Sequence, residues 1–164
     1  MLPSELCELL KRLRMNAPAH SAALTRNVIE ADFCGDGRAW PFAEFDAEPV
    51  ASGTVGQVHR ATLATTGAEV AVKVLHPHVA GQLELDISIL FSVADALSRL
   101  PLLGWLSIPV GVQEFGATLL QQADLTHEAD NLRRFGVNFG DRDLAVVFPM
   151  VHDDLVSKRV LVRP

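Results

Sequence analysis

Basic residues are scarce in this sequence: 14 lysines and arginines stand against 20 acidic residues, for a net charge of −6 at pH 7. So few cations form no basic stripe that could neutralise a phosphate backbone, which excludes nucleic acid as an expected partner. Cysteine is also scarce, and Cys7 and Cys34 lie in different segments without metal-ligand spacing. Because two such cysteines cannot build a disulfide framework, we expect a reducing compartment.

The sequence also lacks an apolar run long enough to cross a bilayer. Its longest apolar helical stretch, residues 83–100, is interrupted by Glu84, Asp86, Asp95 and Arg99. We therefore expect that the chain by itself is not transmembrane.

What the chain does have is 164 residues with a hydrophobic content of 49%, enough for one domain with a buried core. Leucines at helical spacing predict a first helix within residues 1–21. The basic residues there would suit a transit peptide, but Glu5 and Glu8 favour an ordinary helix. With a second helix predicted over 23–33, residues 1–40 form a helical segment before the main domain.

From residue 42 onward the apolar pattern changes to that of short strands. A turn at residues 64–68 joins two of them into an antiparallel hairpin. We expect an α+β fold in which residues 41–164 form a single domain, with an antiparallel sheet of about five strands packed with helices. The predicted strands cover residues 42–53, 55–63, 69–75, 144–151 and 159–164.

Two helices are predicted between the third and fourth of these strands. The first, over about 79–100, carries an apolar stripe that either packs in a core or faces a membrane or partner. Its acidic polar face favours the core. The second helix, over about 110–138, carries Glu128. The stripe consists of Leu83, Ile87, Leu90, Phe91, Ala94 and Leu97.

Lys73 lies in a strand of alternating character, EVAVKVL. Successive side chains of a strand point to opposite faces, so the three valines face the core while Ala71 and Lys73 share the other face. A small residue beside the lysine lets a flat ring lie against Ala71 while the ammonium reaches phosphates. By spacing alone, a solvated lysine on a polar sheet face is the better explanation.

Gly53 and Gly56 lie in a turn between strands, shortly before Lys73. Small residues there allow backbone N–H groups to approach phosphate oxygens closely, although the pattern alone is weakly specific. His76 and His78 could suggest a metal pair, but no further ligands stand at suitable spacing. We therefore expect no metal site in this chain.

An acidic residue on a helix would complete the comparison with protein kinases, which pair the phosphate-binding lysine with a helical glutamate. Glu128 is the candidate, and its position far beyond Lys73 implies an inserted helical element. The alternative is a surface glutamate whose charge is balanced by Arg133 and Arg134, an arrangement that contributes little to the stability of the fold.

Three segments together carry a specific resemblance: FDAEPVASGTVGQVHRA, GAEVAVKVLHP and QQADLTHEADNLRRF. In this order they resemble the UbiB or ADCK (aarF domain-containing) family of atypical kinases, nearest its branch numbered two. The likeness covers nearly the whole chain and implies the amino-terminal lobe of a kinase-like fold, with the carboxy-terminal lobe absent. It also implies a parent protein that binds ATP with Mg²⁺ and acts in mitochondrial coenzyme Q or lipid metabolism.

The resemblance assigns roles to individual residues. It implies Lys73 as the nucleotide lysine beside Ala71, with Glu128 as its ion-pair partner. Gln122 and Asp124 stand where many relatives carry an acid-x-acid motif, and Gln122 departs from that pattern. The implied nucleotide loop consists of Ala51, Ser52, Gly53, Thr54 and Gly56, and further family motif positions are Gln57 and Asn131.

Several motifs of active kinases do not occur in the 164 residues. No HxD is followed by the asparagine of a catalytic loop, and no DFG supplies a metal ligand. The lysine-x-glycine-glutamine motif of the family does not occur either. We therefore expect nucleotide binding without phosphoryl transfer by this chain. The alternative is a non-catalytic module that docks a protein or lipid partner.

Overall fold

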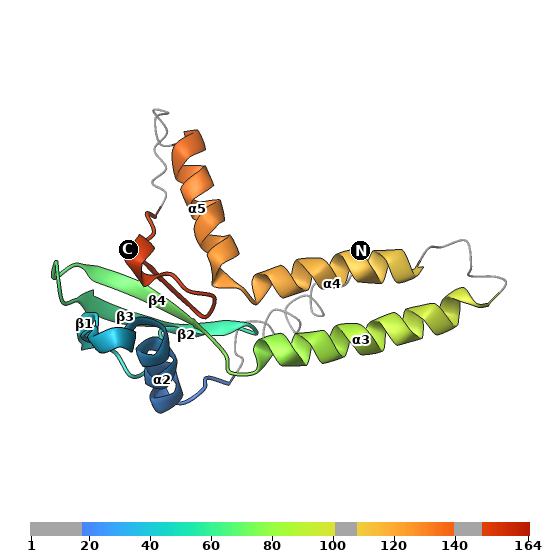
Figure 1. Ribbon diagram of the computed structural model, residues 1–164, viewed down its shortest axis with the longest axis horizontal. Helices are drawn as coiled ribbons and strands as arrows, with labels where there is room; N and C mark the ends of the chain where they lie inside the picture. The colour runs from blue at the N-terminus through green and yellow to red at the C-terminus, as the bar shows by residue number, and fades with distance from the viewer. Residues whose placement is uncertain (1–17, 101–107, 140–148) are drawn as a thin grey trace, which may run out of the picture. The chain divides into compact units, whose positions relative to one another are not determined.

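The computed structural model describes residues 18–100, 108–139 and 149–164 (Figure 1). They form two compact units: a sheet with α2 and α5, and a helical hairpin within residues 78–124. The elements are α2 (Ala22–Phe33), η1 (Gly35–Gly37), β1 (Phe42–Phe45), β2 (Ala51–Ser52), β3 (Gly56–Leu63), β4 (Glu69–Leu75), α3 (Val79–Ser98), α4 (Ile108–Gln122), α5 (Leu125–Phe139), η3 (Asp153–Leu155) and β5 (Val160–Arg163).

The sheet has five antiparallel strands in the order β1-β3-β4-β5, with the short β2 also paired to β3. This confirms the predicted α+β fold with an antiparallel sheet of about five strands. β3 and β4 form the central hairpin, in register from Gly56 opposite Leu75 to Thr62 opposite Glu69. Gly67 adopts a φ of +70° in the turn, a conformation that glycine tolerates without strain.

One face of the sheet packs on α2 (Figure 1). Val70, Val72 and Val74 of β4 are buried on this face, as the alternation predicted. Ile29 and Phe33 of α2 belong to the same apolar cluster. The observed α2 confirms the second predicted helix to within one residue, whereas the first predicted helix lies almost wholly outside the described residues.

The opposite face of the sheet carries Lys73 and is covered near β5 by α5. Leu161 of β5, which pairs with Lys73, is fully buried, and so are Leu125 and Ala129 of α5. The backbone N–H of Leu125 also donates to the carbonyl oxygen of Lys158 at 2.9 Å. These contacts anchor the first turn of α5 beside the lysine.

The structure corrects the single helix predicted over about 110–138, because α4 and α5 are separated at Ala123 and Asp124. The N–H groups of these two residues donate to carbonyls three residues back, which tightens and ends α4. The next N–H, that of Leu125, then donates to Lys158 instead of continuing the helix. Apolar residues keep their helical spacing across this break, so periodicity alone could not reveal it.

The strand predicted over 42–53 is also corrected, because the structure has two short strands there, β1 and β2. Pro49 lies between them and lacks the N–H that a continuous ladder requires. β5 confirms the strand predicted over 159–164. The part of the 144–151 prediction that the structure describes is not a strand, and the rest lies outside the described residues.

The second unit is a hairpin in which α3 and α4 run side by side and antiparallel (Figure 1). Gly116 of α4 permits the close approach, since a Cβ there would lie 2.7 Å from Cγ2 of Ile87. The stripe expected to be core is largely exposed: Ala94 is buried, but Leu90 and Phe91 are not. α4 buries only the part of α3 that faces it.

Across residues 18–100, 108–139 and 149–164, the structure contains no helix that is both long and apolar enough to cross a membrane.

Gly56 allows β3 and β4 to approach closely at the start of their hairpin. A Cβ on Gly56 would lie 2.5 Å from the carbonyl oxygen of Val74. We expect Gly56→Ala to lower the free energy of unfolding, measured in urea, by about 1–3 kcal/mol because the two strands must separate. Gly53→Ala is the control: its Cβ would meet nothing closer than 3.8 Å, so a change within about 0.5 kcal/mol is expected. Equal losses in the two variants would contradict this cause.

Candidate functional site

Lys73 and Glu128 form an ion pair, with Nζ 2.5 Å from Oε2. β4 supplies the lysine, and the first turn of α5 supplies the glutamate, where the helix dipole favours a negative charge. The lysine side chain is 24% exposed and the glutamate side chain 34% exposed. The pair is therefore partly shielded from water but still within reach of a ligand.

The structure does not support the alternative in which arginines on the same helix balance Glu128. Arg133 instead contacts Asp130 at 2.5 Å and Asp153 at 2.6 Å. Ala71 lies two residues before Lys73 on the same open face of the sheet and is half-buried. Lysine, alanine and glutamate thus form one group around β4.

The remaining motif positions lie elsewhere. Asn131 is exposed on α5, nearly one turn beyond Glu128. Gln122 is the last residue of α4 and Asp124 follows shortly after it, so both belong to the helical hairpin unit. Gln122 and Asp124 therefore belong to a different unit from the ion pair.

The predicted nucleotide loop connects β2 to β3 and is closed on itself. The N–H of Gly53 donates to the carbonyl oxygen of Gly56 at 3.0 Å. His76, directly after β4, holds the loop twice: its N–H donates to Val55 O at 3.0 Å, and its Nε2 lies 2.9 Å from Gly53 O. The loop is therefore tied to the strand that carries Lys73.

Ser52 adds an unsatisfied hydroxyl to this loop. Among residues 18–100, 108–139 and 149–164, its Oγ is the buried side-chain polar atom without a hydrogen-bond partner. Leaving a buried hydroxyl unpaired costs about 1–3 kcal/mol. Ala51 and Thr54 of the same loop are exposed. Ser52 pairs with Gln57 across β2 and β3, so its side chain lies on the face of the sheet away from Lys73.

A polar cluster that the sequence reading missed lies on the α2 face of the sheet. Gln57 and His59 of β3 and Thr25 of α2 are fully buried there. Gln57 Oε1 accepts the backbone N–H of His20 at 3.0 Å, and Gln57 Nε2 donates to Thr25 Oγ1 at 3.0 Å. Gln57 therefore faces away from Lys73. Strand alternation could have found this cluster, because it places Gln57 and His59 on the core face.

Two more contacts join the histidines to this cluster. Nδ1 of His20 lies 2.8 Å from Nδ1 of His76, and Nδ1 of His59 lies 2.8 Å from the carbonyl oxygen of Asp46. Burial, with His76 and His59 nearby, lowers the pKa of His20 to about 4. Burial also lowers the pKa of His59, against the opposing effect of the Asp46 carbonyl. Both rings are therefore neutral at pH 7.

In the described parts of the chain, no group of three or more histidine, cysteine or acidic side chains could hold a metal ion. His76 contacts His20 and Gly53 O, so it is not paired with His78 around a metal. Mg²⁺ requires oxygen ligands, and Glu128 is engaged by Lys73. The site residues therefore fit a phosphate but do not fit Mg²⁺.

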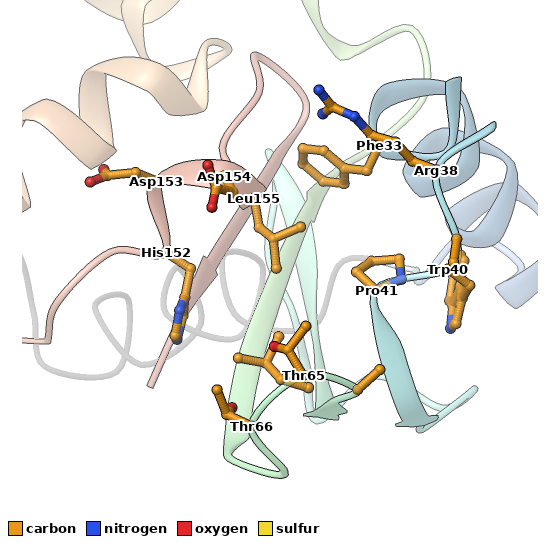
Figure 2. Close-up of a pocket in the computed structure, with 13 residues that line it drawn as sticks. Phe33, Arg38, Trp40, Pro41, Thr65, Thr66, His152, Asp153, Asp154 and Leu155 are labelled. Atoms are coloured by element: carbon orange, nitrogen blue, oxygen red, sulfur yellow. The ribbon is translucent and has the colours of Figure 1, made fainter. Parts of the chain in front are cut away.

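A separate cavity of about 450 Å³ lies at the other end of the sheet, beside the β3–β4 turn (Figure 2). Phe33, Trp40, Pro41 and Leu155 supply much of its apolar wall, and Asp154 also lines it. None of its lining residues belongs to the ion pair or to the β2–β3 loop. This cavity is not part of the predicted site.

Comparison with known proteins gives consistent matches. The family model described as ABC1 atypical kinase-like domain matches residues 12–163. A probable serine/threonine-protein kinase of Dictyostelium discoideum, abkC, is 42% identical over 162 residues, covering 99% of this chain and 23% of the relative. A mitochondrial ABC1 family protein of Schizosaccharomyces pombe is 31% identical over 191 residues, covering 99% and 27%. A probable protein kinase UbiB of Marinobacter nauticus is 33% identical over 163 residues, covering 99% and 29%.

A solved structure is similar as well. The Mycobacterium tuberculosis protein Rv3197, determined as a complex with erythromycin, has a TM-score of 0.71 and 26% sequence identity. The match covers 99% of this chain and 40% of that one. The chain thus spans roughly a quarter of the length of the curated relatives it matches, between 23% and 29% for the three above.

Acid should destabilise the fold through His20. An unfolded ring has a pKa of 6.5, whereas in the folded chain the pKa of His20 is lowered to about 4. Between these values the unfolded state binds more protons, so the free energy of unfolding should fall as the pH is lowered from 6.5 towards 4. Urea unfolding at a series of pH values measures this dependence.

His20→Asn isolates the contribution of the ring. Asparagine keeps a donor near the Nδ1 position but does not titrate in this range. The variant should therefore lose the part of the pH dependence that His20 supplies. The same slope in variant and wild type would show that other groups cause it.

Proposed function

Because the chain belongs to the ABC1 atypical kinase-like family, we propose that it is the nucleotide-binding lobe of an atypical kinase or ATPase and that it binds ATP. The observation that carries this proposal is the ion pair between Lys73 and Glu128, with Nζ 2.5 Å from Oε2. Kinases use a strand lysine, fixed by a helical glutamate, to hold nucleotide phosphates. Relation to the branch numbered two of that family remains a prediction.

The residues around β4 would divide the binding of ATP among them. The adenine ring would lie against Ala71, whose small side chain leaves room on the open face of the sheet. The ammonium of Lys73 would neutralise phosphate charge, while Glu128 fixes its direction. The β2–β3 loop would lie over the phosphates, where its backbone N–H groups could approach their oxygens.

Phosphoryl transfer needs a base and metal ions in addition to these contacts. The 164 residues contain neither an HxD followed by the asparagine of a catalytic loop nor a DFG. We therefore propose that these residues bind the nucleotide without transferring its phosphoryl group. In the whole protein, a carboxy-terminal lobe would provide the base and the ligands of Mg²⁺, which neutralises the developing charge when bound.

For the cellular setting we propose the mitochondrion, with a role in coenzyme Q or lipid metabolism. Relatives from Schizosaccharomyces pombe and Saccharomyces cerevisiae are named mitochondrial ABC1 family proteins. The bacterial relatives carry the name UbiB. These names support the setting at the level of the family.

A second candidate function is a non-catalytic module that docks a protein or lipid partner. The exposed apolar side chains of α3 and α4 favour it, among them Leu85, Ile89, Val110 and Phe115. Nucleotide titration separates the two functions. A whole protein that captures a partner through this surface but gains no thermal stability from ATP would favour the second.

Nucleotide affinities of four proteins test the first function. We expect Lys73→Met to weaken ATP binding roughly tenfold or more, because a charge-assisted contact worth about 1.5–3 kcal/mol is lost. Glu128→Gln should weaken binding less, and should add nothing once the lysine is gone, because Glu128 acts through it. Calorimetric titration of the whole protein, both single variants and the double variant gives the four values.

Lys158→Met is the matched control, since Lys158 is exposed and lies outside the site. Its ATP affinity should equal that of the wild type. Additive losses in the double variant would reject the pairing of Lys73 with Glu128. Full ATP affinity in Lys73→Met would overturn the proposed function.

A further inference from the structure

We propose that His76 is a positioning residue for the β2–β3 loop, and that a proton-ordered chain through His20, Thr25, Gln57 and His59 sets its orientation. The inference rests on the proposed function only where it says that the loop receives phosphates. The five side chains come from β3, from the residue directly after β4, from α2 and from the segment before it, so the chain links segments that are distant in sequence.

Two backbone carbonyls fix the ends of the chain. A carbonyl oxygen only accepts, so the ring nitrogen that contacts it must carry a proton. His76 Nε2 lies 2.9 Å from Gly53 O, and His59 Nδ1 lies 2.8 Å from Asp46 O. In neutral rings, Nδ1 of His76 and Nε2 of His59 are then acceptors.

The groups between these ends follow in order. Since Nδ1 of His76 accepts, Nδ1 of His20 must donate to it across 2.8 Å. Nε2 of His20 is then an acceptor and takes the hydroxyl proton of Thr25 at 3.0 Å. The amide of Gln57 completes the chain, because its two hydrogens reach Thr25 Oγ1 at 3.0 Å and His59 Nε2 at 2.9 Å.

With neutral rings, this arrangement of protons satisfies every contact of the chain. A further proton on His20 would go to Nε2, where it would oppose the hydroxyl proton of Thr25 and disturb that 3.0 Å contact. The titratable groups that face one another here are the three imidazoles themselves, and Asp46 acts on His59 through both its backbone carbonyl and its charge. Burial of His20 keeps the added proton out at neutral pH.

This arrangement of protons determines which hydrogen bonds hold the β2–β3 loop. His76 presents its Nε2–H to Gly53 O, while its backbone N–H holds Val55, so one residue fixes two points of the loop. Gln57, next to the loop in β3, accepts in turn the backbone N–H of His20, which precedes α2. A loop ordered in advance loses less conformational freedom when a ligand binds, which strengthens binding.

Two substitutions at His76 distinguish the roles of its two ring nitrogens. Asparagine retains an acceptor near Nδ1 but loses the donor at Nε2, whereas glutamine retains a donor near Nε2. We expect His76→Asn to speed amide hydrogen exchange of residues 53–56 and to weaken ATP binding, each roughly three- to tenfold, because one hydrogen bond is lost. His76→Gln should retain most of both properties. His127→Asn, at an exposed position on α5, should change neither.

The tautomers can be read without any substitution. Nitrogen chemical shifts of ¹⁵N-histidine in the whole protein should show His76 protonated on Nε2, and His20 and His59 protonated on Nδ1, at pH 7. His76 protonated on Nδ1, or loop exchange in His76→Asn equal to wild type, would overturn the proposal. If the tautomers and exchange are as expected but the wild type binds no ATP, the proposed function fails and the positioning of the loop stands.

Discussion

The structure depends on the antiparallel pairing of β3 with β4, which gives each strand two faces of different chemistry. Val72 and Val74 pack in the core with α2, while Lys73 between them is directed to the other face, under α5. Because neighbouring strands share this alternation, Gln57 and His59 lie on the core side. A shift of register by one residue would exchange the two faces and bury the lysine.

The alternation explains why the sheet and the lysine could be predicted from sequence. Each depends on local spacing, which is visible in a run such as EVAVKVL. The pairing of Lys73 with Glu128 required more, since the two lie in different elements: the comparison with protein kinases nominated the glutamate, and the family resemblance was needed to prefer it to a surface residue. Alternation also places Gln57 and His59 on the core face, but the contacts of the histidines could not be derived, because the ends of the cluster are backbone carbonyls of Gly53 and Asp46, whose positions follow from the folded loops.

The helices show the limit of periodicity as a guide. Apolar spacing continues across Ala123 and Asp124, yet the chain ends α4 there because the N–H of Leu125 finds a partner beside β5. The stripe on α3 was assigned to a core because its polar face is acidic. In the folded chain, α4 covers one part of it and leaves Leu90 and Phe91 exposed. Burial depends on the number of partners that a helix has, which its own sequence does not specify.

The central claim is that Lys73 contacts a nucleotide, and lysine reactivity tests it most directly. The acetylation rate of each lysine can be measured by mass spectrometry with and without ATP. ATP should slow acetylation of Lys73, which lies at the site, and leave the exposed Lys158 unchanged as an internal control. If saturating ATP slows neither lysine, or slows both equally, the site does not bind a nucleotide through Lys73.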